Sequence, residues 1–322
     1  TDPWKILVEP GIFDLQGATL TMKDFIDIQG SGRDVTYIRS FGAQTVLVPA
    51  TVNAELRDLT VQSFTDASGT AVETRSSEFL LTQVNLEAVS ATNATAFVSN
   101  GANPRVSEVF ARVASEQGSS VGYQVIGGAP VISEAFALIE SAAGNGTGFD
   151  VLDNAFPTLL EIRALVLGVN RTGTGLASNN SRPQVQNCNL VIGGQFGGQG
   201  SRGIFLTRES NATIKDCVVN AVGAFQAAGL WVERDSEAKV NESTFAGIAN
   251  TGYGLINRAG TTQVDRGTLE GSTRSVINLG GGDVALIGAS RLVGPVQAAL
   301  GSTLSCAQSY NGVNAPVNPA CL

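Results

Sequence analysis

A short pattern returns along the second half of the chain at nearly constant spacing, and this repetition constrains the fold more than any other feature. In each copy an apolar residue is followed by a turn of mostly polar residues and then by another apolar residue. The copies begin at Val185, Ile214, Val240 and Val264, which are 29, 26 and 24 residues apart. A period of this size is typical of solenoids, in which every repeat forms one coil.

A second apolar segment accompanies the first in each repeat. It begins at Gly203, Gly229 and Gly254, and earlier copies begin at Gly148 and Gly175. The unit is too short for a propeller blade of about 40 residues, and it lacks the apolar spacing of helices. We predict an all-β, single-stranded right-handed parallel β-helix of about ten to eleven coils. It forms one domain over residues 1–322, with residues 303–322 as its C-terminal cap.

Composition supports strands and argues against several classes of partner. Hydrophobic residues make up 43% of the chain and charged residues only 15%, so few long amphipathic surface helices are expected. The net charge of −8 gives no general attraction to nucleic acid. The sequence has no run of about 18 apolar residues, so we expect no membrane insertion.

The four cysteines fall into two pairs. Cys306 and Cys321 bracket a C-terminal tail with little apolar periodicity, and we predict a disulfide there that fixes an otherwise loose end. Such a bridge implies an exported protein. Cys188 and Cys217 occupy equivalent positions on adjacent coils. We favour a stack of two apolar thiols over a second disulfide, because parallel side chains in register point the same way.

Two stretches near the start resemble the opening coils of pectin-lyase-like proteins. Residues 5–15 read Lys-Ile-Leu-Val-Glu-Pro-Gly-Ile-Phe-Asp-Leu, with Phe13 in place of the usual tyrosine, and residues 25–32 read Phe-Ile-Asp-Ile-Gln-Gly-Ser-Gly. Residues 54–61, Ala-Glu-Leu-Arg-Asp-Leu-Thr-Val, and the C-terminal cysteine pair extend the resemblance. The whole chain resembles bacterial right-handed β-helix repeat proteins of unassigned function. This implies the fold and a place at the bacterial cell surface, outside the cell or in the periplasm, but not a function.

Many pectin-lyase-like proteins act on acidic polysaccharides, but their catalytic motifs do not occur in this sequence. There is no histidine, no Asp-Asp pair and no Arg-Ile-Lys element of the polygalacturonase type. Residues 148–151 match the pectin methylesterase element only in part, and Trp231 lacks the histidine that follows tryptophan in pectate lyases. The absence of histidine also removes Ser-His and Cys-His nucleophile pairs and the commonest metal ligand. We therefore expect no catalytic residue, no metal and no cofactor, although carboxylate pairs keep a polysaccharide-degrading activity open.

Charged residues follow the second apolar segment of three successive repeats. Arg208, Arg234 and Arg258 would form a ladder of cations on an otherwise acidic protein. Either this ladder binds the carboxylates of an acidic glycan, or it belongs to a surface charge network between coils, which we favour. The candidate ligand-binding residues are Arg208, Arg234, Arg258, Glu209, Glu233 and Asp235. We place Trp231 in the core, because it aligns with apolar residues of neighbouring repeats.

Two functions remain open. We favour an exported, non-catalytic β-helix protein with a structural or adhesive role at the bacterial surface or in a surface assembly. The alternative is a protein that binds or degrades an acidic polysaccharide. The N-terminal coil has no cap beyond residues 2–4, so we also expect self-association or an upstream segment at that coil.

Overall fold

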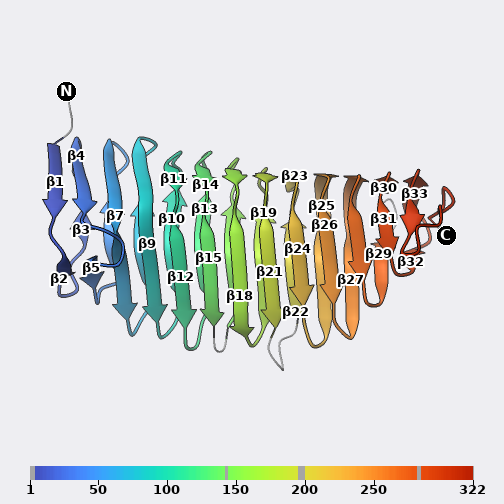
Figure 1. Cartoon of the computed structure of the whole chain (residues 1–322), viewed down its shortest axis with the longest axis horizontal. Helices are drawn as coiled ribbons and strands as arrows, with labels where there is room; N and C mark the ends of the chain where they lie inside the picture. The colour runs from blue at the N-terminus through green and yellow to red at the C-terminus, as the bar shows by residue number, and fades with distance from the viewer. Residues whose placement is uncertain (1–3, 142–143, 195–199, 281–283, 322) are drawn as a thin grey trace.

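The computed structural model describes residues 4–141, 144–194, 200–280 and 284–321, and the ends of the predicted domain and cap, residues 1–3 and Leu322, lie outside them. The described residues form 34 strands that pair in parallel. They stack into a right-handed parallel β-helix of about eleven turns, with the N-terminal and C-terminal coils at opposite ends (Figure 1). This confirms the predicted fold class. Among the described residues, no helix is long and apolar enough to cross a bilayer.

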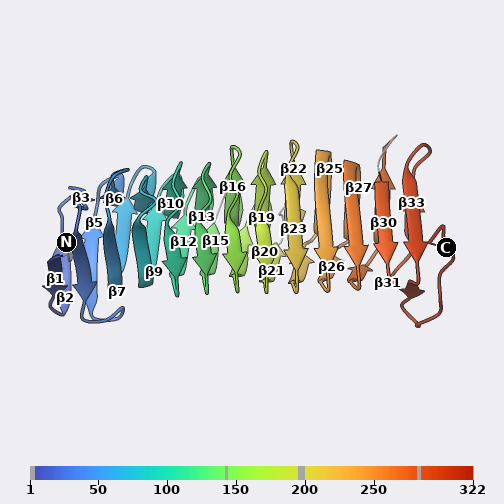
Figure 2. The same cartoon turned by 90° about the horizontal axis from the view of Figure 1, so that it is seen from above.

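Each turn of the β-helix contributes strands to three columns, here called A, B and C, which Figure 2 shows from a second direction. Column A consists of β1 (Trp4–Val8), β4 (Ile26–Gly30), the first parts of β7 (Ala54–Thr65) and β9 (Phe79–Ser90), β11 (Arg105–Ser107), β14 (Val131–Ser133), β17 (Thr158–Leu160), β20 (Gln184–Gln186), β23 (Asn211–Lys215), the second parts of β25 (Gln226–Asn241) and β27 (Thr251–Asp265), β30 (Val284–Gly288) and β33 (Thr303–Ala307). Column B consists of β2 (Gly11–Asp14), β5 (Thr36–Ser40), the second parts of β7 and β9, β12 (Phe110–Ser115), β15 (Phe136–Ser141), β18 (Arg163–Val169), β21 (Asn189–Gly194), β24 (Val218–Val222), β26 (Thr244–Ile248), β28 (Thr268–Gly271), β31 (Arg291–Val293) and β34 (Tyr310–Asn311). Column C consists of β3 (Leu20–Thr21), β6 (Gln44–Val48), β8 (Gly69–Thr74), β10 (Ala94–Asn100), β13 (Ser120–Ile126), β16 (Gly146–Leu152), β19 (Thr172–Asn179), β22 (Gly200–Thr207), the first parts of β25 and β27, β29 (Arg274–Leu279) and β32 (Val296–Ala298).

The repeat found in the sequence is the register of column A. Val185 pairs with Ile214, Ile214 with Val240, and Val240 with Val264. All four side chains are buried in one continuous hydrophobic core. Because strand residues alternate between faces, every second residue of these strands points inward and adds to the stack. Burial of each such side chain contributes about 2 kcal/mol toward folding.

The corner between columns A and B is built from residues in the left-handed backbone conformation. One non-glycine residue per coil holds φ between 45° and 56° there. These residues are Asp58, Gln83, Glu108, Glu134, Glu161, Asn187, Asp216, Glu242, Arg266, Ala289 and Gln308. Asparagine and aspartate tolerate this conformation better than other side chains, and glutamate does not share that preference. The sequence predicted polar turns at these points but not their left-handed conformation.

Buried amides line the interior near the C-terminal end. Asn257 and Asn278 are both fully buried, and the Asn257 amide donates to the Asn278 side-chain oxygen at 2.8 Å. The Asn278 amide in turn donates to the Thr303 carbonyl at 2.8 Å. A buried amide costs free energy unless it is hydrogen-bonded, so this ladder satisfies groups that would otherwise destabilise the core.

A disulfide joins Cys188 and Cys217 on adjacent coils, and the expected pair of stacked thiols is therefore wrong. Both cysteines lie in the corner between columns A and B, just outside the strands. Their Cα atoms are 4.4 Å apart, at the short end of the range that a disulfide spans. The argument from parallel strands did not apply, because a corner residue need not point in the direction that its strand neighbours take.

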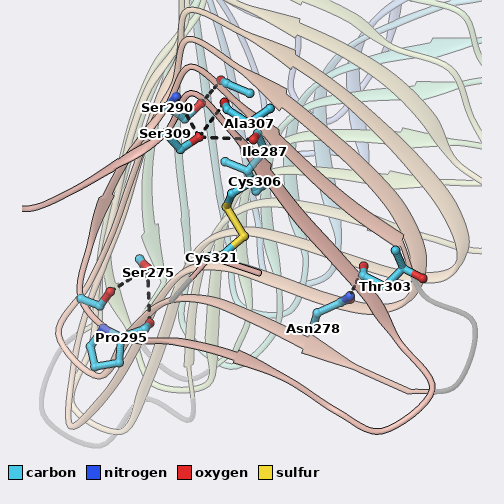
Figure 3. Close-up of a disulfide and its surroundings, with 12 residues drawn as sticks. Ser275, Asn278, Ile287, Ser290, Pro295, Thr303, Cys306, Ala307, Ser309 and Cys321 are labelled. Atoms are coloured by element: carbon cyan, nitrogen blue, oxygen red, sulfur yellow. Dashed lines mark hydrogen bonds between the residues drawn. A yellow bond between two sulfur atoms is a disulfide. The ribbon is translucent and has the colours of Figure 1, made fainter. Parts of the chain in front are cut away.

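The C-terminal tail folds back against β33. Cys306 and Cys321 form a disulfide with a Cα separation of 5.2 Å, as Figure 3 shows in close-up. The Cys306 N–H donates to the Pro319 carbonyl, and the Val317 N–H donates to the Ser309 carbonyl. Val317 also packs against the hydrophobic core. The tail is thus tied to the last strands by a covalent bond, backbone hydrogen bonds and apolar contact.

Candidate arginine–aromatic site

Trp231 lies on the outer face of column C, not in the core. Its neighbours Leu230 and Val232 belong to the main core, so alternation turns the indole outward. There it packs against a second, separate apolar cluster, here called the outer cluster, which consists of Ala228, Tyr253, Ile256 and Ile277 with Trp231 and Leu279 at its edge. Our placement of Trp231 in the core is therefore wrong.

Arg202 lies over two aromatic rings beside the outer cluster. Its guanidinium carbon is 4.3 Å from the centre of the Phe205 ring and 4.5 Å from that of Trp231. Phe205 and Trp231 are register partners on β22 and β25, with ring centres 5.9 Å apart. A cation over an aromatic face is attracted by the ring quadrupole, so the two rings hold the guanidinium in a fixed orientation.

A hollow of about 190 Å³ opens beside these rings. Its lining residues are Thr172, Gly200, Ser201, Arg202, Gln226 and Trp231. The indole Nε1 of Trp231 is buried, and it has no hydrogen-bond acceptor within the described part of the chain. Indole N–H groups normally find an acceptor when they are buried, so this donor is available to an outside group.

Arg202 is largely removed from water without a carboxylate partner. Burial lowers the pKa of its guanidinium, and the charge of Glu233 acts in the opposite direction. No ion pair to Arg202 is formed by the residues that the structure describes. An arginine carries five N–H donors and stays charged, so a desolvated guanidinium with no anionic partner favours binding of an external anion.

The predicted arginine ladder divides into two parts. Arg208 and Arg234 both occupy the corner between columns C and A with left-handed φ, and the Glu209 N–H on one coil donates to the Arg234 carbonyl on the next. Arg258 instead pairs in register with Glu233, one position earlier. Two of the three arginines therefore stack at the corner, and the third lies on the strand.

The acidic candidates surround these cations. Glu233 is mostly covered, and one of its carboxylate oxygens lies 3.7 Å from Nε of Arg234. Glu209 and Asp235 are exposed at the same corner. Arg208 and Arg258 form no ion pair with any carboxylate among the described residues. The corner is therefore only partly neutralised, and two exposed cations remain near the hollow.

Asp150 continues the row of Phe205 and Trp231 toward the N-terminus. It pairs with Ala177, which pairs with Phe205. Burial raises the pKa of the Asp150 carboxyl, and the nearby charge of Asp153 raises it further. A hydrogen bond at 3.2 Å from the Gln124 amide acts against both effects. The row thus combines a partly desolvated carboxylate with the arginine–aromatic site.

A larger hollow of about 450 Å³ lies on the outer face of column A, but its cations already have partners. Lys239 is 3.1 Å from Glu237, Lys215 is 3.6 Å from Asp216, and Arg266 is 2.7 Å from Glu242. This is the neutralised charge network that we had favoured for the predicted arginine ladder, on a different face. Within the described residues, no group of three or more acidic or cysteine side chains is placed to hold a metal ion.

Arg202 was absent from the sequence-based candidates. It precedes the apolar segment that begins at Gly203, whereas the search followed the charges after that segment. The available signal was its distance from Phe205: three residues along a strand, with a bulge at the intervening Gly203, place both on one face.

No protein-family model and no curated protein matches the sequence. Among solved structures, the chain is similar to the A-module of the mannuronan C-5 epimerase AlgE4 from Azotobacter vinelandii, with 14% identity and a TM-score of 0.50 over 98% of this chain and 90% of that one. It is also similar to a pectin methylesterase from Yersinia enterocolitica, with 13% identity and a TM-score of 0.33 over 57% of this chain and 86% of that one. A GH87 α-1,3-glucanase catalytic domain in complex with nigerose has 10% identity and a TM-score of 0.36 over 94% of this chain and 60% of that one. At these identities the likeness establishes the pectin-lyase-like fold alone.

Proposed function

We propose that the protein is an exported, non-catalytic β-helix that binds polysaccharide on the outer face of column C, with an adhesive or structural role at a bacterial surface. The observation that carries this proposal is the outer cluster. Trp231 and Tyr253 present aromatic surface on a flat sheet, apart from the core, with Arg202 and Arg258 beside them. Aromatic rings offer apolar surface to sugar rings, and arginines donate hydrogen bonds to their oxygens.

Two further observations support parts of this proposal. The disulfides Cys188–Cys217 and Cys306–Cys321 are consistent with an oxidising compartment and therefore with export. The outer face of column C runs along successive coils about 4.8 Å apart, a straight track along which a long polymer could lie.

The test is a binding assay against a panel of neutral and acidic oligosaccharides, with product analysis on the same samples. We expect binding that Trp231→Ala weakens about tenfold, the loss typical of one aromatic contact. Phe156→Ala is the matched control, because Phe156 is 48% exposed and lies outside the outer cluster. No binding anywhere in the panel would overturn the proposal, and cleaved or epimerised products would overturn its non-catalytic part.

Self-association at the first coil is a second proposal. Trp4 and Ile6 pair in register with Ile26 and Ile28 and so face the core, yet they are 80% and 48% exposed. Apolar side chains in such a position favour a partner that covers them, and a second copy of the chain is the partner that we propose.

Light scattering over a range of protein concentrations tests this contact. We expect the mass to rise with concentration in the wild type and to stay that of one chain in Ile6→Lys. Leu300→Lys is the control, since Leu300 is fully exposed near the other end. A single-chain mass for the wild type at every concentration would exclude self-association at this coil.

A further inference from the structure

The hollow beside Trp231 has the donors that a single carboxylate needs. Arg202 and Trp231 both line it, and neither the guanidinium nor the indole Nε1–H has an acceptor among the described residues. Both groups are also held in place: the guanidinium lies over two rings, and the indole packs edge-on against Phe205 with an interplanar angle of 78°. Donors that are fixed before binding lose little entropy when a ligand arrives.

We infer that this hollow is a subsite for the carboxylate of a uronic acid unit, an inference that rests on the proposed polysaccharide binding. Arg202 would donate two parallel hydrogen bonds to the carboxylate, which is the geometry that the planar guanidinium favours. The Trp231 Nε1–H donates a further bond, and the apolar outer cluster receives the ring of the same or the next sugar unit.

The residues next to Arg202 leave room for this arrangement. Its register partners on the flanking strands are Thr174 and Ala228, both small. The Ser201 hydroxyl donates to the Val222 carbonyl at 2.7 Å and so anchors the strand immediately before Arg202. A bulky partner in either flanking position would displace the guanidinium from the rings, so the small neighbours are what allow the site to form.

Size also favours a carboxylate over a larger group. A volume of about 190 Å³ is below the 300–1,000 Å³ that is common for pockets that enclose drug-sized ligands. It suits one substituent of a sugar whose ring remains outside. Thr172 and Gln226 at its edge supply neutral polar groups, and no lining residue is acidic, so an anion meets no negative charge inside the hollow.

The experiment compares tri-galacturonate with its methyl ester, which has the same ring but no negative charge. Calorimetry gives the affinities, and the indole N–H resonance of Trp231 reports contact. The sequence holds only two tryptophans, so Trp231→Phe assigns that resonance. We expect the acid to bind at least tenfold more tightly than the ester and to shift the resonance.

Variants separate this inference from the proposed function. Arg202→Gln should remove the preference for the acid while leaving affinity for the ester, and Arg202→Lys should restore only part of it, because lysine lacks the planar fork. Arg163→Gln, an exposed arginine on column B, is the matched control. If acid and ester bind equally, the carboxylate subsite is wrong and polysaccharide binding stands. If neither binds, the proposed function itself fails.

Discussion

Arg258 lies beside Glu233 of the preceding coil rather than beside Arg234. The cause is the corner that separates columns C and A. β25 turns this corner with two left-handed residues, Arg234 and Asp235, whereas β27 uses only Ala259. The shorter corner shifts the register by one residue and brings a carboxylate next to a cation on the binding face.

Glu233→Gln should therefore strengthen binding of an acidic oligosaccharide. Loss of this carboxylate removes repulsion next to Arg202 and Arg258, and we expect about a threefold gain in affinity, in the range of a half-exposed charge pair. The gain should shrink in 0.5 M salt, roughly the range in which surface charges are screened. Calorimetry at two salt concentrations measures it. Glu270→Gln on column B serves as the control, and equal effects in both variants would contradict a local cause.

The carboxyl of Asp150 gives a stability that depends on pH. Burial raises its pKa in the folded state, so the folded protein binds the proton more tightly than the unfolded chain does. The resulting stability is present below the unfolded pKa of about 3.9 and is lost as pH rises through the folded pKa. Asp150→Asn should thus be more favourable, relative to wild type, at pH 7 than at pH 3.

Denaturant unfolding at the two pH values measures this difference. Asp66→Asn, which changes an exposed aspartate, should show no such dependence. An Asp150→Asn effect of the same size at both pH values would mean that the carboxyl titrates alike in the folded and unfolded chains.

Relief of left-handed strain should stabilise the corner between columns A and B. Glu134 holds a φ of 50°, a conformation that asparagine adopts at lower cost. We expect Glu134→Asn to raise the free energy of unfolding by about 0.5–1 kcal/mol. Glu116→Asn removes the same charge at an exposed position without positive φ and should change stability little. Equal stabilisation in both variants would assign the effect to charge instead.

Removal of the C-terminal disulfide should release the tail. The bridge closes a loop of 15 residues, for which chain entropy predicts a loss of about 3 kcal/mol in the Cys306→Ser/Cys321→Ser variant. Limited proteolysis should then cut between Ser309 and Pro319 while the core strands stay protected. A tail that resists cleavage in this variant would show that Val317 and the backbone hydrogen bonds hold it without the bridge.

The repeat in the sequence was enough to predict the fold and the register of column A, because inward apolar residues recur at a fixed place in each coil. The same pattern failed for column C. Leu230, Trp231 and Val232 are consecutive apolar residues, so alternation does not reveal which of them faces outward. The position of Arg258 depended on the number of left-handed residues in one corner, which the sequence pattern does not encode.

Cys188 and Cys217 show the same limit in covalent form. Their equivalent positions on adjacent coils were correctly aligned, but the direction of each side chain is set by the corner backbone. The hollow beside Trp231 was also beyond prediction, since it depends on the small size of Thr174 and Ala228 on neighbouring strands 26 to 28 residues away.

The bridge between Cys188 and Cys217 has a mechanical consequence. In a solenoid each coil contacts only its neighbours, so unfolding can proceed one coil at a time from either end, like a zip. A covalent link between two central coils blocks that progress, because the two coils can no longer be peeled apart separately. Under force, the chain should therefore lengthen in small steps, pause at the middle with the loop between the two cysteines still closed, and yield its full length only when that bond is reduced.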